Sequence, residues 1–452
     1  MLDLARFDGD RKVLSLCPEY AVCPRCSAWA YRNEVRTRPF WTPSLEKTTI
    51  CEVEAGCYIC PKCPDGNRWF MLLPADFQTS GQYSLLARSK VVELMRDHRL
   101  SAEAAAAVGR RMLNLPVLHP TTVLDWFRDA GAAVDMEQRT RDGIKACSGQ
   151  IAVDEVYDDK WYQIKVTDPI NQIEIAWKLS EGNPSEADVE SFFRELKQKG
   201  LLPQLVVTDG SNLYPGVIAR VWPDAKHQRC VFHFMKQLNK DLGKAFWAVY
   251  KTMPAPPTRK AGRPKRRGRP RKDALKRANR QAVRDARFLF VTREENLNDD
   301  GRRVLGEAIG LCLPLGTLRR FVRKVHELFG PSTDSKQKAS ARRRVIVDDR
   351  EFKNLKALIP ALKRLEDDEL WARLTRYLDF ENADKTSNNP ERENREFRNH
   401  QKAHYRLRSE AALRSLLSFL TVRRPVPEHP QRLLPRKKDV HSSKREEDRK
   451  AA

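Results

Sequence analysis

Three carboxylates in three different local patterns are the residues of this chain best suited to chemistry. Asp154 ends the run Gln150-Ile-Ala-Val, and Asp209 ends the run Leu205-Val-Val-Thr. Glu391 follows Ser387-Asn-Asn-Pro. Carboxylates that share one pocket repel one another and stay ionised only if divalent cations neutralise them, and magnesium prefers such hard oxygen ligands. The three acids therefore favour a two-metal site that breaks and forms phosphodiester bonds.

The residues around the first two acids alternate as a mixed sheet with covering helices should. Three β-rich runs joined by short polar turns predict an antiparallel meander, at residues 150–157, 160–166 and 172–179. The next elements predicted are a helix from Ser185, which opens a capping pattern, to Gly200, a buried strand at 205–209, a helix at 213–221 and a strand at about 229–233. The resulting order is βββαβαβ.

This order resembles the ribonuclease H fold, in which the first and fourth strands are neighbours. Asp154 and Asp209 sit at comparable strand positions, so the fold would direct both carboxylates into one pocket. A single aspartate at a strand end is more often simply solvated. Two of them at matching positions are better explained by a shared metal site.

Residues from about 148 to 422 resemble the DDE transposases of the Mutator-like group and its bacterial insertion-sequence relatives. Four patterns carry the resemblance: Val153-Asp154-Glu155, Thr208-Asp209-Gly210, Cys230-Val-Phe-His233 and Ser387-Asn-Asn-Pro-Glu391-Arg-x-Asn394-Arg395. The resemblance implies that Asp154, Asp209 and Glu391 form the catalytic triad and hold two magnesium or manganese ions. It also implies site-adjacent roles for Cys230, His233, Asn394 and Arg395. Glu155 and Glu393 stand beside the preferred acids, but the spacing after Asn-Pro selects Glu391.

The third pattern also makes physical sense by itself. Asn388 or Asn389 could cap a helix that presents Glu391 together with basic side chains. Those predicted to contact DNA phosphates on this helix are Arg392, Arg395 and Arg398. The alternative is an ordinary charged and solvated helix face. For Cys230 and His233, the alternative is a buried thiol and a histidine whose hydrogen bonds are satisfied.

Seven of the ten cysteines precede residue 64, which in an intracellular protein favours metal ligation over disulfides. Cys23-Pro-Arg-Cys26 and Cys60-Pro-Lys-Cys63 are two near-identical pairs that together could hold one structural zinc ion. Other ligand sets remain open, because Cys17, Cys51 and Cys57 repeat part of the spacing. An iron–sulfur site using Cys57, Cys60 and Cys63 would lack its usual fourth cysteine.

The formal net charge of +24 over 452 residues favours an acidic polymer, and hence nucleic acid, as partner. Helical patterns between residues 90 and 131, with Ser101 as an N-cap, resemble a helix-turn-helix whose reading helix begins at Thr121. Thr121, Thr122 and Arg128 would then face DNA. A plain three-helix packing domain is the alternative.

The long stretch between Asp209 and Glu391 predicts a helical insertion into the catalytic core, with helices at 305–329 and 352–377. It opens with a basic strip at residues 259–272 that contains Gly-Arg-Pro twice and resembles a tandem AT-hook. Arg263 and Arg269 would enter the minor groove of A·T-rich DNA. A disordered basic linker that attracts any phosphate backbone is the alternative.

The predicted architecture is an α/β ribonuclease H-like core interrupted by an α-helical insertion and preceded by a zinc ribbon and a helix-turn-helix-like domain. The predicted segments are a zinc ribbon at 1–75, a helix-turn-helix at 88–135, core parts at 148–245 and 376–424, the insertion at 246–375 and a disordered basic tail at 425–452. No apolar run long enough to span a membrane and no signal-peptide order at the N-terminus are present, so the chain should stay inside the cell.

The function expected is that of a DNA transposase that binds terminal inverted repeats and catalyses cleavage and strand transfer into target DNA. Pairing of two DNA ends implies a homodimer or a larger homo-oligomer. Cytoplasmic association with the nucleoid is expected in a bacterium, and a nuclear location in a eukaryote. Two alternatives are a domesticated, noncatalytic DNA-binding regulator and a nuclease of the same fold that lacks strand transfer.

Overall fold

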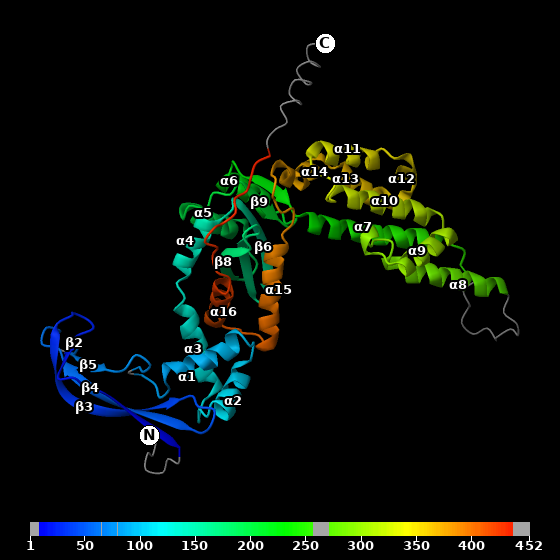
Figure 1. Ribbon diagram of the computed structural model, residues 1–452. Coiled ribbons are helices and arrows are strands. Elements are labelled where there is room, and N and C mark those ends of the chain that lie inside the picture. Colours follow the sequence, from blue (N-terminus) through cyan, green and yellow to red (C-terminus); the bar gives the residue numbers. More distant parts are fainter. Residues whose placement is uncertain (1–8, 65, 79, 256–270, 437–452) are drawn as a thin grey trace, which may run out of the picture. The chain divides into compact units, whose positions relative to one another are not determined.

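The computed structural model describes residues 9–64, 66–78, 80–255 and 271–436. The chain divides into two compact units (Figure 1). Unit 1 comprises Met1–Arg139 and Glu393–Arg424, and unit 2 comprises Thr140–Arg392 and Pro425–Ala452. Both units are therefore assembled from segments that are far apart in the sequence.

Unit 1 begins with a five-stranded sheet in the order β1-β4-β3-β2, and β5 pairs with the remaining part of β4. β1 runs parallel to β4, while the other pairs are antiparallel. The strands are β1 (Asp10–Leu16), β2 (Tyr20–Val22), β3 (Trp29–Thr42), β4 (Thr49–Ile59) and β5 (Trp69–Leu72). The Cys-Pro-basic-Cys pairs fall in the turns after β2 and β4, which brings both pairs to the same end of the sheet.

Helices complete unit 1: α1 (Leu85–Arg96), α2 (Ala102–Met112), α3 (Pro120–Ala132) and α16 (Glu410–Val422). Ser101 caps α2 by accepting the backbone N–H of Ala104, as the sequence predicts. Helix α16 lies directly on α3, where the ring centroids of Phe127 and Phe419 are 5.1 Å apart. Gly131 permits this approach, because a Cβ there would come within 2.2 Å of the Cβ of Ser415.

Unit 2 contains a second five-stranded sheet in the order β10-β9-β6-β7-β8. β6, β7 and β8 form the predicted antiparallel meander, and β9 and β10 run parallel to β6. The elements are β6 (Gln150–Asp158), β7 (Trp161–Asp168), β8 (Ile173–Glu181), α5 (Glu186–Gln198), β9 (Leu205–Thr208), α6 (Tyr214–Val221) and β10 (Lys226–Arg229). The capping box at the start of α5, between Ser185 and Asp188, is also the predicted one.

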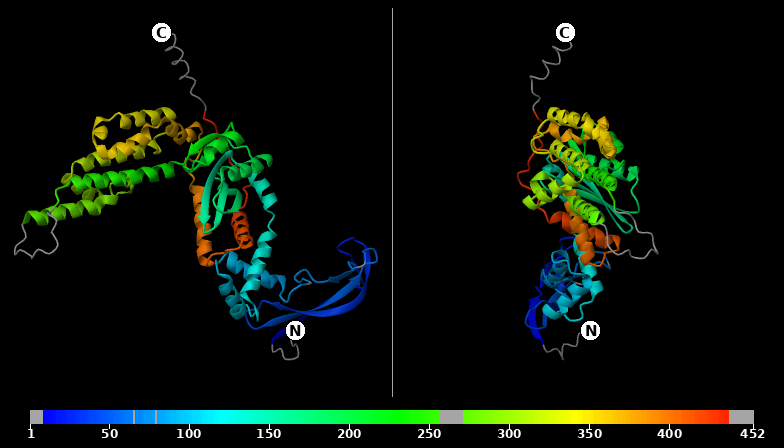
Figure 2. Two further views of the ribbon diagram at one scale, coloured as in Figure 1. Left: turned by 180° about the vertical axis from the view of Figure 1, so that it is seen from behind. Right: turned by 90° about the vertical axis from the view of Figure 1, so that its right-hand side faces the viewer.

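After β10 the chain enters a helical insertion with its own hydrophobic core, visible as one group of helices in Figures 1 and 2. Its helices are α7 (Val231–Thr252), α8 (Arg271–Asp285), α9 (Asp299–Leu311), α10 (Pro314–Leu328), α11 (Lys336–Val347), α12 (Arg350–Asn354), α13 (Ile359–Glu366) and α14 (Asp368–Leu374). Short 3-10 turns join them: η2 (Ala286–Phe288), η3 (Glu294–Asn296), η4 (Lys356–Leu358) and η5 (Arg376–Asp379). Two further helices cross the division between the units, α4 (Met136–Ala146) and α15 (Asn388–Ala403).

Four predicted elements differ from the structure. The helix expected at 352–377 is divided into α12, η4, α13, α14 and η5. The strand expected at 229–233 ends at Arg229, and Val231 already begins α7. The helix expected at 305–329 is interrupted before Pro314, which cannot continue a helix through its missing N–H. The tail from residue 425 was expected to be disordered. Of this tail the structure describes residues 425–436, which pack on unit 2, where the backbone N–H of Leu433 donates to the carbonyl of Ser148 at 2.8 Å.

The basic strip with the Gly-Arg-Pro repeats lies almost wholly outside the described residues, and Arg263 and Arg269 with it. In the part of the chain that is described, no helix combines the length and the apolar character needed to cross a bilayer.

Candidate active site and cysteine cluster

Asp154 and Asp209 lie at the same level of two neighbouring parallel strands. The register of β6 and β9 pairs Ala152 with Val207, and each aspartate follows its member of that pair by two residues. Asp154 shares the face of Ala152, because side chains two residues apart on a strand point to the same face. Asp209 is the residue directly after β9, so both acids reach the same edge of the sheet, as expected if the first and fourth strands are neighbours, and both charges act on His233.

Local structure explains why each aspartate sits at the boundary of the core. Ala152 and Val153 are fully buried before Asp154, and Val207 and Thr208 before Asp209. Asp209 then opens a turn, because its Oδ1 accepts the backbone N–H of Ser211 at 2.8 Å. Both strands thus deliver a polar side chain at the point where their burial ends.

Glu155 points away from this site. It follows Asp154 on β6, so its side chain lies on the opposite face of the sheet. There, burial and the nearby Glu155 carboxylate raise the pKa of Tyr214 well above its ordinary value, and they raise the pKa of Tyr162 in the same way; the charge of Asp209 adds to both shifts. The opposite orientation of Asp154 and Glu155 therefore rests on the alternation of side chains along β6.

Hydrogen bonds hold the segment that leads to Glu391 against the sheet. The buried amide of Gln150 donates to the carbonyl of Asp384 at 2.7 Å and accepts the N–H of Asp384 at 2.9 Å. Asn389 donates to the carbonyl of Asp168 at 3.1 Å. Helix α15 begins at Asn388, so both asparagines that were expected as caps lie within its first turn.

Cys230 and His233 tie the same segment to the end of β9. The backbone N–H of Cys230 donates to the carbonyl of Thr208 at 2.8 Å, and its Sγ accepts the N–H of Ser387 at 3.2 Å. Ser387 Oγ and His233 Nδ1 are 3.5 Å apart. Since Ser387 also accepts the N–H of Glu391, the third acid is one helical turn from this junction.

The electrostatics of the junction link it to the two aspartates. The hydrogen bond to Cys230 raises the pKa of His233, and the charges of Asp154 and Asp209 add to that shift. Burial opposes ionisation of the Cys230 thiol, but hydrogen bonds from His233 and Ser387 outweigh burial and lower its pKa. The Cys-x2-His pattern is thus a structural link between β9, α7 and the start of α15.

The carboxylate oxygens of the three acids lie farther apart than the ligand atoms of a single ion. In the described ranges, the only group of three or more His, Cys, Asp or Glu side chains with all ligand atoms within 4.8 Å of one another is a cysteine cluster. A pair of ions about 3.5–4 Å apart spans a wider space than one ion, so its ligands need not meet so closely. The donor set of hard carboxylate oxygens fits magnesium or manganese.

Two cationic residues near the acids were not singled out from the sequence. Half-buried Arg229 lies beside Asp209, because a Cβ on Gly210 would come within 2.5 Å of its Nη2. Burial and the charge of Arg373 lower the pKa of Arg229, while Asp209 opposes that shift. Lys165 is the register partner of Asp154 and is fully buried, 2.9 Å from Glu174. Its position between Ile164 and Val166 on β7 was the available signal.

Beyond Glu391, α15 carries the remaining predicted residues into unit 1. Glu393 is buried and pairs with Arg424 at 2.7 Å, which commits it to a structural role. Asn394 is buried as well. The arginines predicted to contact the site or DNA are all exposed: Arg392, Arg395 and Arg398.

The predicted reading helix is only partly free to contact DNA. Thr121 is exposed and lies 2.8 Å from the Nδ1 atom of His119, and Thr122 is half-buried. Arg128 donates to Asp125 at 3.0 Å and to Ser409 at 3.2 Å. DNA contact by Arg128 therefore requires these bonds to be exchanged.

Four cysteines of unit 1 form a compact cluster. Cys23, Cys26, Cys60 and Cys63 have their sulfur atoms within 4.8 Å of one another, and the separation is 3.4 Å between Cys26 and Cys60. This is the ligand set that the paired pattern predicts. Cys51 and Cys57 lie outside the cluster on β4, where burial raises the pKa of both thiols.

The turns that carry the cysteines favour thiolates. Backbone N–H groups of Arg25 and Cys26 lower the pKa of Cys23 to about 6 in spite of burial. Burial and the neighbouring sulfurs raise the pKa of Cys63 to about 12. Four sulfurs at this separation cannot all be anionic without a cation between them, so the cluster fits a metal ion bound by thiolates.

The model of the ISL3 family of DDE transposases, described as "Transposase", matches residues 151–383, just over half of the chain. The protein therefore belongs to this transposase family. The matched range includes Asp154, Asp209, Cys230 and His233 and ends shortly before Glu391.

Comparison with individual proteins adds little. No curated protein matches the sequence. Among solved structures, the Drosophila P element transposase strand transfer complex is similar over 76% of this chain and 93% of that chain, with 12% sequence identity and a TM-score of 0.34.

Proposed function

We propose that this transposase cuts DNA at transposon ends and joins the ends to target DNA, using Asp154, Asp209 and Glu391 as one metal-binding triad. The observation that carries the proposal is the register of β6 and β9, which sets the two aspartates at one level. The hydrogen bonds of Gln150, Cys230 and Ser387, which hold the segment before Glu391, support Glu391 as the third acid of the triad. The sheet order, with β9 beside β6, supports a ribonuclease H-like core.

In this proposal Asp154, Asp209 and Glu391 would together hold two magnesium or manganese ions, which would supply Lewis acidity for an attacking oxygen and a leaving oxygen. The parallel strands and the Asp209 turn orient the carboxylates before DNA arrives, which lowers the cost of reorganisation. Arg229 is a cation beside Asp209 that limits repulsion between the acids and can contact a DNA phosphate.

The reaction consists of two phosphodiester exchanges in one site. Water attacks the phosphodiester at a transposon end, and the P–O bond to the 3′ oxygen breaks to leave a 3′-hydroxyl. That hydroxyl then attacks a target phosphodiester and displaces another 3′ oxygen. Neither step needs a covalent bond between protein and DNA, which agrees with a site built from carboxylates rather than from a nucleophile.

The other parts of the chain are proposed to bind and organise DNA. Cys23, Cys26, Cys60 and Cys63 would hold one structural zinc ion, because tetrahedral four-thiolate sites are typical of zinc. Helix α3, the exposed arginines of α15 and the AT-hook-like strip are proposed DNA contacts, and the net charge of +24 supports DNA as partner. A homodimer or larger homo-oligomer would pair two ends.

The test is cleavage of DNA that carries the inverted repeats flanking the element, with magnesium or manganese, by the intact chain and by Asp209→Asn. Cleavage and joined products from the intact chain alone would support the proposal. Cleavage without joined products would indicate a nuclease. Equal cleavage by both proteins would contradict the triad, and tight binding without cleavage by either would indicate a regulator.

A further inference from the structure

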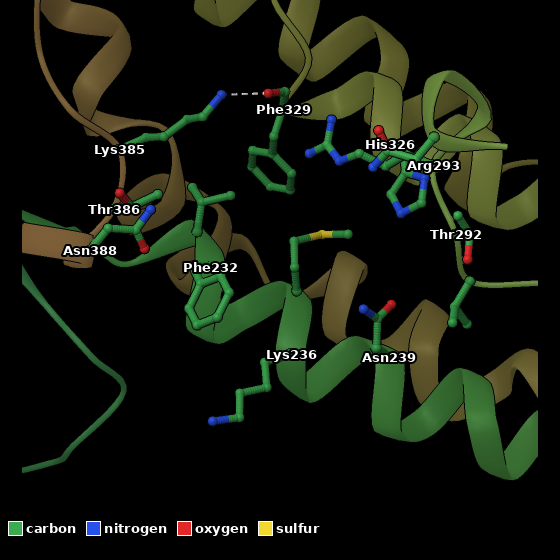
Figure 3. Close-up of a pocket in the computed structure, with 14 residues that line it drawn as sticks. Phe232, Lys236, Asn239, Thr292, Arg293, His326, Phe329, Lys385, Thr386 and Asn388 are labelled. Carbon is green, nitrogen blue, oxygen red and sulfur yellow. Dashed lines mark hydrogen bonds between the residues drawn. The ribbon is translucent and has the colours of Figure 1, made fainter. Parts of the chain in front are cut away.

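A cavity of about 710 Å³ lies in unit 2 beside the candidate active site (Figure 3). It is formed by the first turns of α7, the segment before η3, the end of α10 and the segment that leads into α15. The side chains on which the argument rests are Phe232, Lys236, Arg293, His326, Phe329 and Lys385. None of them belongs to the triad or to the DNA-binding elements expected from the sequence.

The cavity and the active site share a wall. The backbone N–H of Val231 donates to the carbonyl of Lys385 at 3.0 Å, one residue from Cys230. The ring of Phe232 meets that of His233 edge to face, with centroids 5.6 Å apart. Asn388, the first residue of α15, also lines the cavity. A DNA strand whose phosphate reaches the carboxylates would therefore pass beside the opening.

The charges around the cavity favour an anion. Lys236, Arg293 and Lys385 contribute three cations, and none of the lining residues, all of which are described, is acidic. Burial and the charge of Arg293 lower the pKa of Lys385, and burial with Arg293 and Arg319 lowers the pKa of His326 to about 4. Arg293 also pairs with Glu295 at 3.3 Å, and Lys385 donates to the carbonyl of Phe329 at 2.6 Å (Figure 3), so a bound phosphate would exchange these bonds. Arg293 still repels Lys385, and a phosphate between them would relieve that repulsion.

The remaining lining suits a flat aromatic ring. Phe232 is 42% exposed although it lies beside a buried core, and the half-buried, neutral ring of His326 faces the same space (Figure 3). Phe329 also lines the cavity but is only 2% exposed, so Phe232 and His326 are the rings that a base can contact. The side-chain amides of Asn239, Asn296 and Asn388 can donate to and accept from the edge of a base. The volume falls within the range of about 300–1,000 Å³ typical of small-molecule sites.

Phosphate-binding cations, stacking surfaces and amides in one cavity are the elements that recognise a nucleotide. We propose that this cavity binds one unstacked nucleotide of the DNA strand, next to the phosphodiester presented to Asp154 and Asp209. Turning a base out of a duplex costs a few kcal/mol, and stacking on aromatic side chains returns about 1–3 kcal/mol per base. This inference rests on the proposed function, because it places the strand by the site of cleavage.

The test uses the full chain with Asp209→Asn as background, so that DNA binds without being cut. Duplex transposon ends carry 2-aminopurine at single positions across the cleavage site, because the fluorescence of this base rises when it leaves the stack. We expect a rise of severalfold at one position beside the cleaved phosphodiester. Adding Phe232→Ala should abolish that rise, and Lys236→Gln should weaken binding of the end about fivefold or more.

Matched controls lie on the same helix. Trp247 and Lys244 are exposed residues of α7 outside the cavity, so Trp247→Ala and Lys244→Gln should keep both the fluorescence and the affinity. Thermal melting checks that each variant is folded. Loss of the signal in Trp247→Ala to the same extent as in Phe232→Ala would overturn the assignment.

Three further outcomes distinguish a free nucleotide from a nucleotide of DNA as the ligand, and the cavity proposal from the proposed function. If free dAMP binds in a manner that needs Phe232 while no position in DNA responds, the cavity serves a free nucleotide and the proposal for DNA is wrong. If the wild-type chain cleaves ends but no base leaves the stack, the cavity proposal alone fails. If the wild-type chain does not cleave while one base responds as expected, the proposed function alone fails.

Discussion

Asp154 and Asp209 stand at one level of the sheet although 54 positions separate them in the chain, because β6 and β9 are parallel and Ala152 pairs with Val207. The neighbouring acid Glu155 faces the other side, towards Tyr162 and Tyr214. The strand register therefore selects which of two adjacent carboxylates can share a metal site with Asp209.

The first prediction compares these adjacent acids. Asp154→Asn removes an anionic ligand and should lower DNA cleavage by about 10²–10³-fold, since a metal ion contributes several kcal/mol of transition-state stabilisation. Glu155→Gln is the matched control and should retain cleavage within about tenfold. Rates measured with a labelled end substrate check this, and a greater loss in Glu155→Gln than in Asp154→Asn would contradict the assignment.

The second prediction concerns the two glutamates of α15. Glu391→Gln should abolish cleavage without lowering the melting temperature, because the side chain is only half-buried. Glu393→Gln should lower the melting temperature but retain cleavage, since Glu393 is buried and pairs with Arg424. Loss of that pair should cost about 1–3 kcal/mol of stability. Calorimetry measures the stability of each variant, and cleavage assays measure its activity. An inactive but fully stable Glu393→Gln would indicate that Glu393, and not Glu391, is the third acid of the triad.

The cysteine cluster gives a third prediction. The purified chain should contain about one zinc ion, and Cys60→Ser should lose it because three thiolates bind zinc more weakly than four. Cys57→Ala changes a buried cysteine of the same region that lies outside the cluster, so it should keep the metal. Mass spectrometry measures the zinc content of each variant. Zinc retained in Cys60→Ser would indicate another ligand set.

The sequence was sufficient to predict the strands of the meander and the cysteine ligands because both depend on short-range patterns. The neighbourhood of β6 and β9 was expected only from the resemblance to the ribonuclease H fold. Period-two runs mark β6 to β8, and the repeated Cys-Pro-basic-Cys marks two equivalent turns. The apolar run at Cys230 was ambiguous, because four residues do not distinguish a strand from the first turn of a helix. In the structure Val231 begins α7 instead.

The cavity could not be predicted, since it is built from residues that meet only after folding. Phe232, Arg293, His326 and Lys385 come from four separate segments, and each alone resembles an ordinary surface or core residue. The pairing of Glu393 with Arg424 likewise depends on the return of α16, which no local pattern specifies. Such long-range contacts carry information that periodicity does not contain.

A fourth prediction concerns the buried ion pair of Lys165 and Glu174, in which Lys165 is the register partner of Asp154. Lys165→Met would leave Glu174 buried without its cation and should cost about 3–5 kcal/mol of stability. The pair Lys160 and Glu181, on the same two strands, has a similar separation of 2.8 Å but is exposed. Lys160→Met should therefore cost no more than about 1 kcal/mol. Urea unfolding of both variants checks the contrast, and equal losses would show that burial does not set the strength of the pair.

The last prediction is a loss of stability in acid that arises in unit 1. Burial and the charge of Arg99 lower the pKa of His400 to about 4, and burial lowers that of His404 to about 4, both from an ordinary value of 6.5. Between pH 6.5 and pH 4 the unfolded chain binds protons that the folded chain does not, so stability must fall as the pH falls through this window.

Each of these histidines can contribute up to about 3 kcal/mol to that loss, at about 1.4 kcal/mol per pKa unit. His404→Phe removes one titrating group next to Phe127 and should flatten the dependence of the melting temperature on pH. His98 is exposed in the same unit, so His98→Gln should leave the dependence unchanged. If His404→Phe and the wild-type chain lose the same stability between pH 6.5 and pH 4, the neutral state of His404 in the folded protein is disproved.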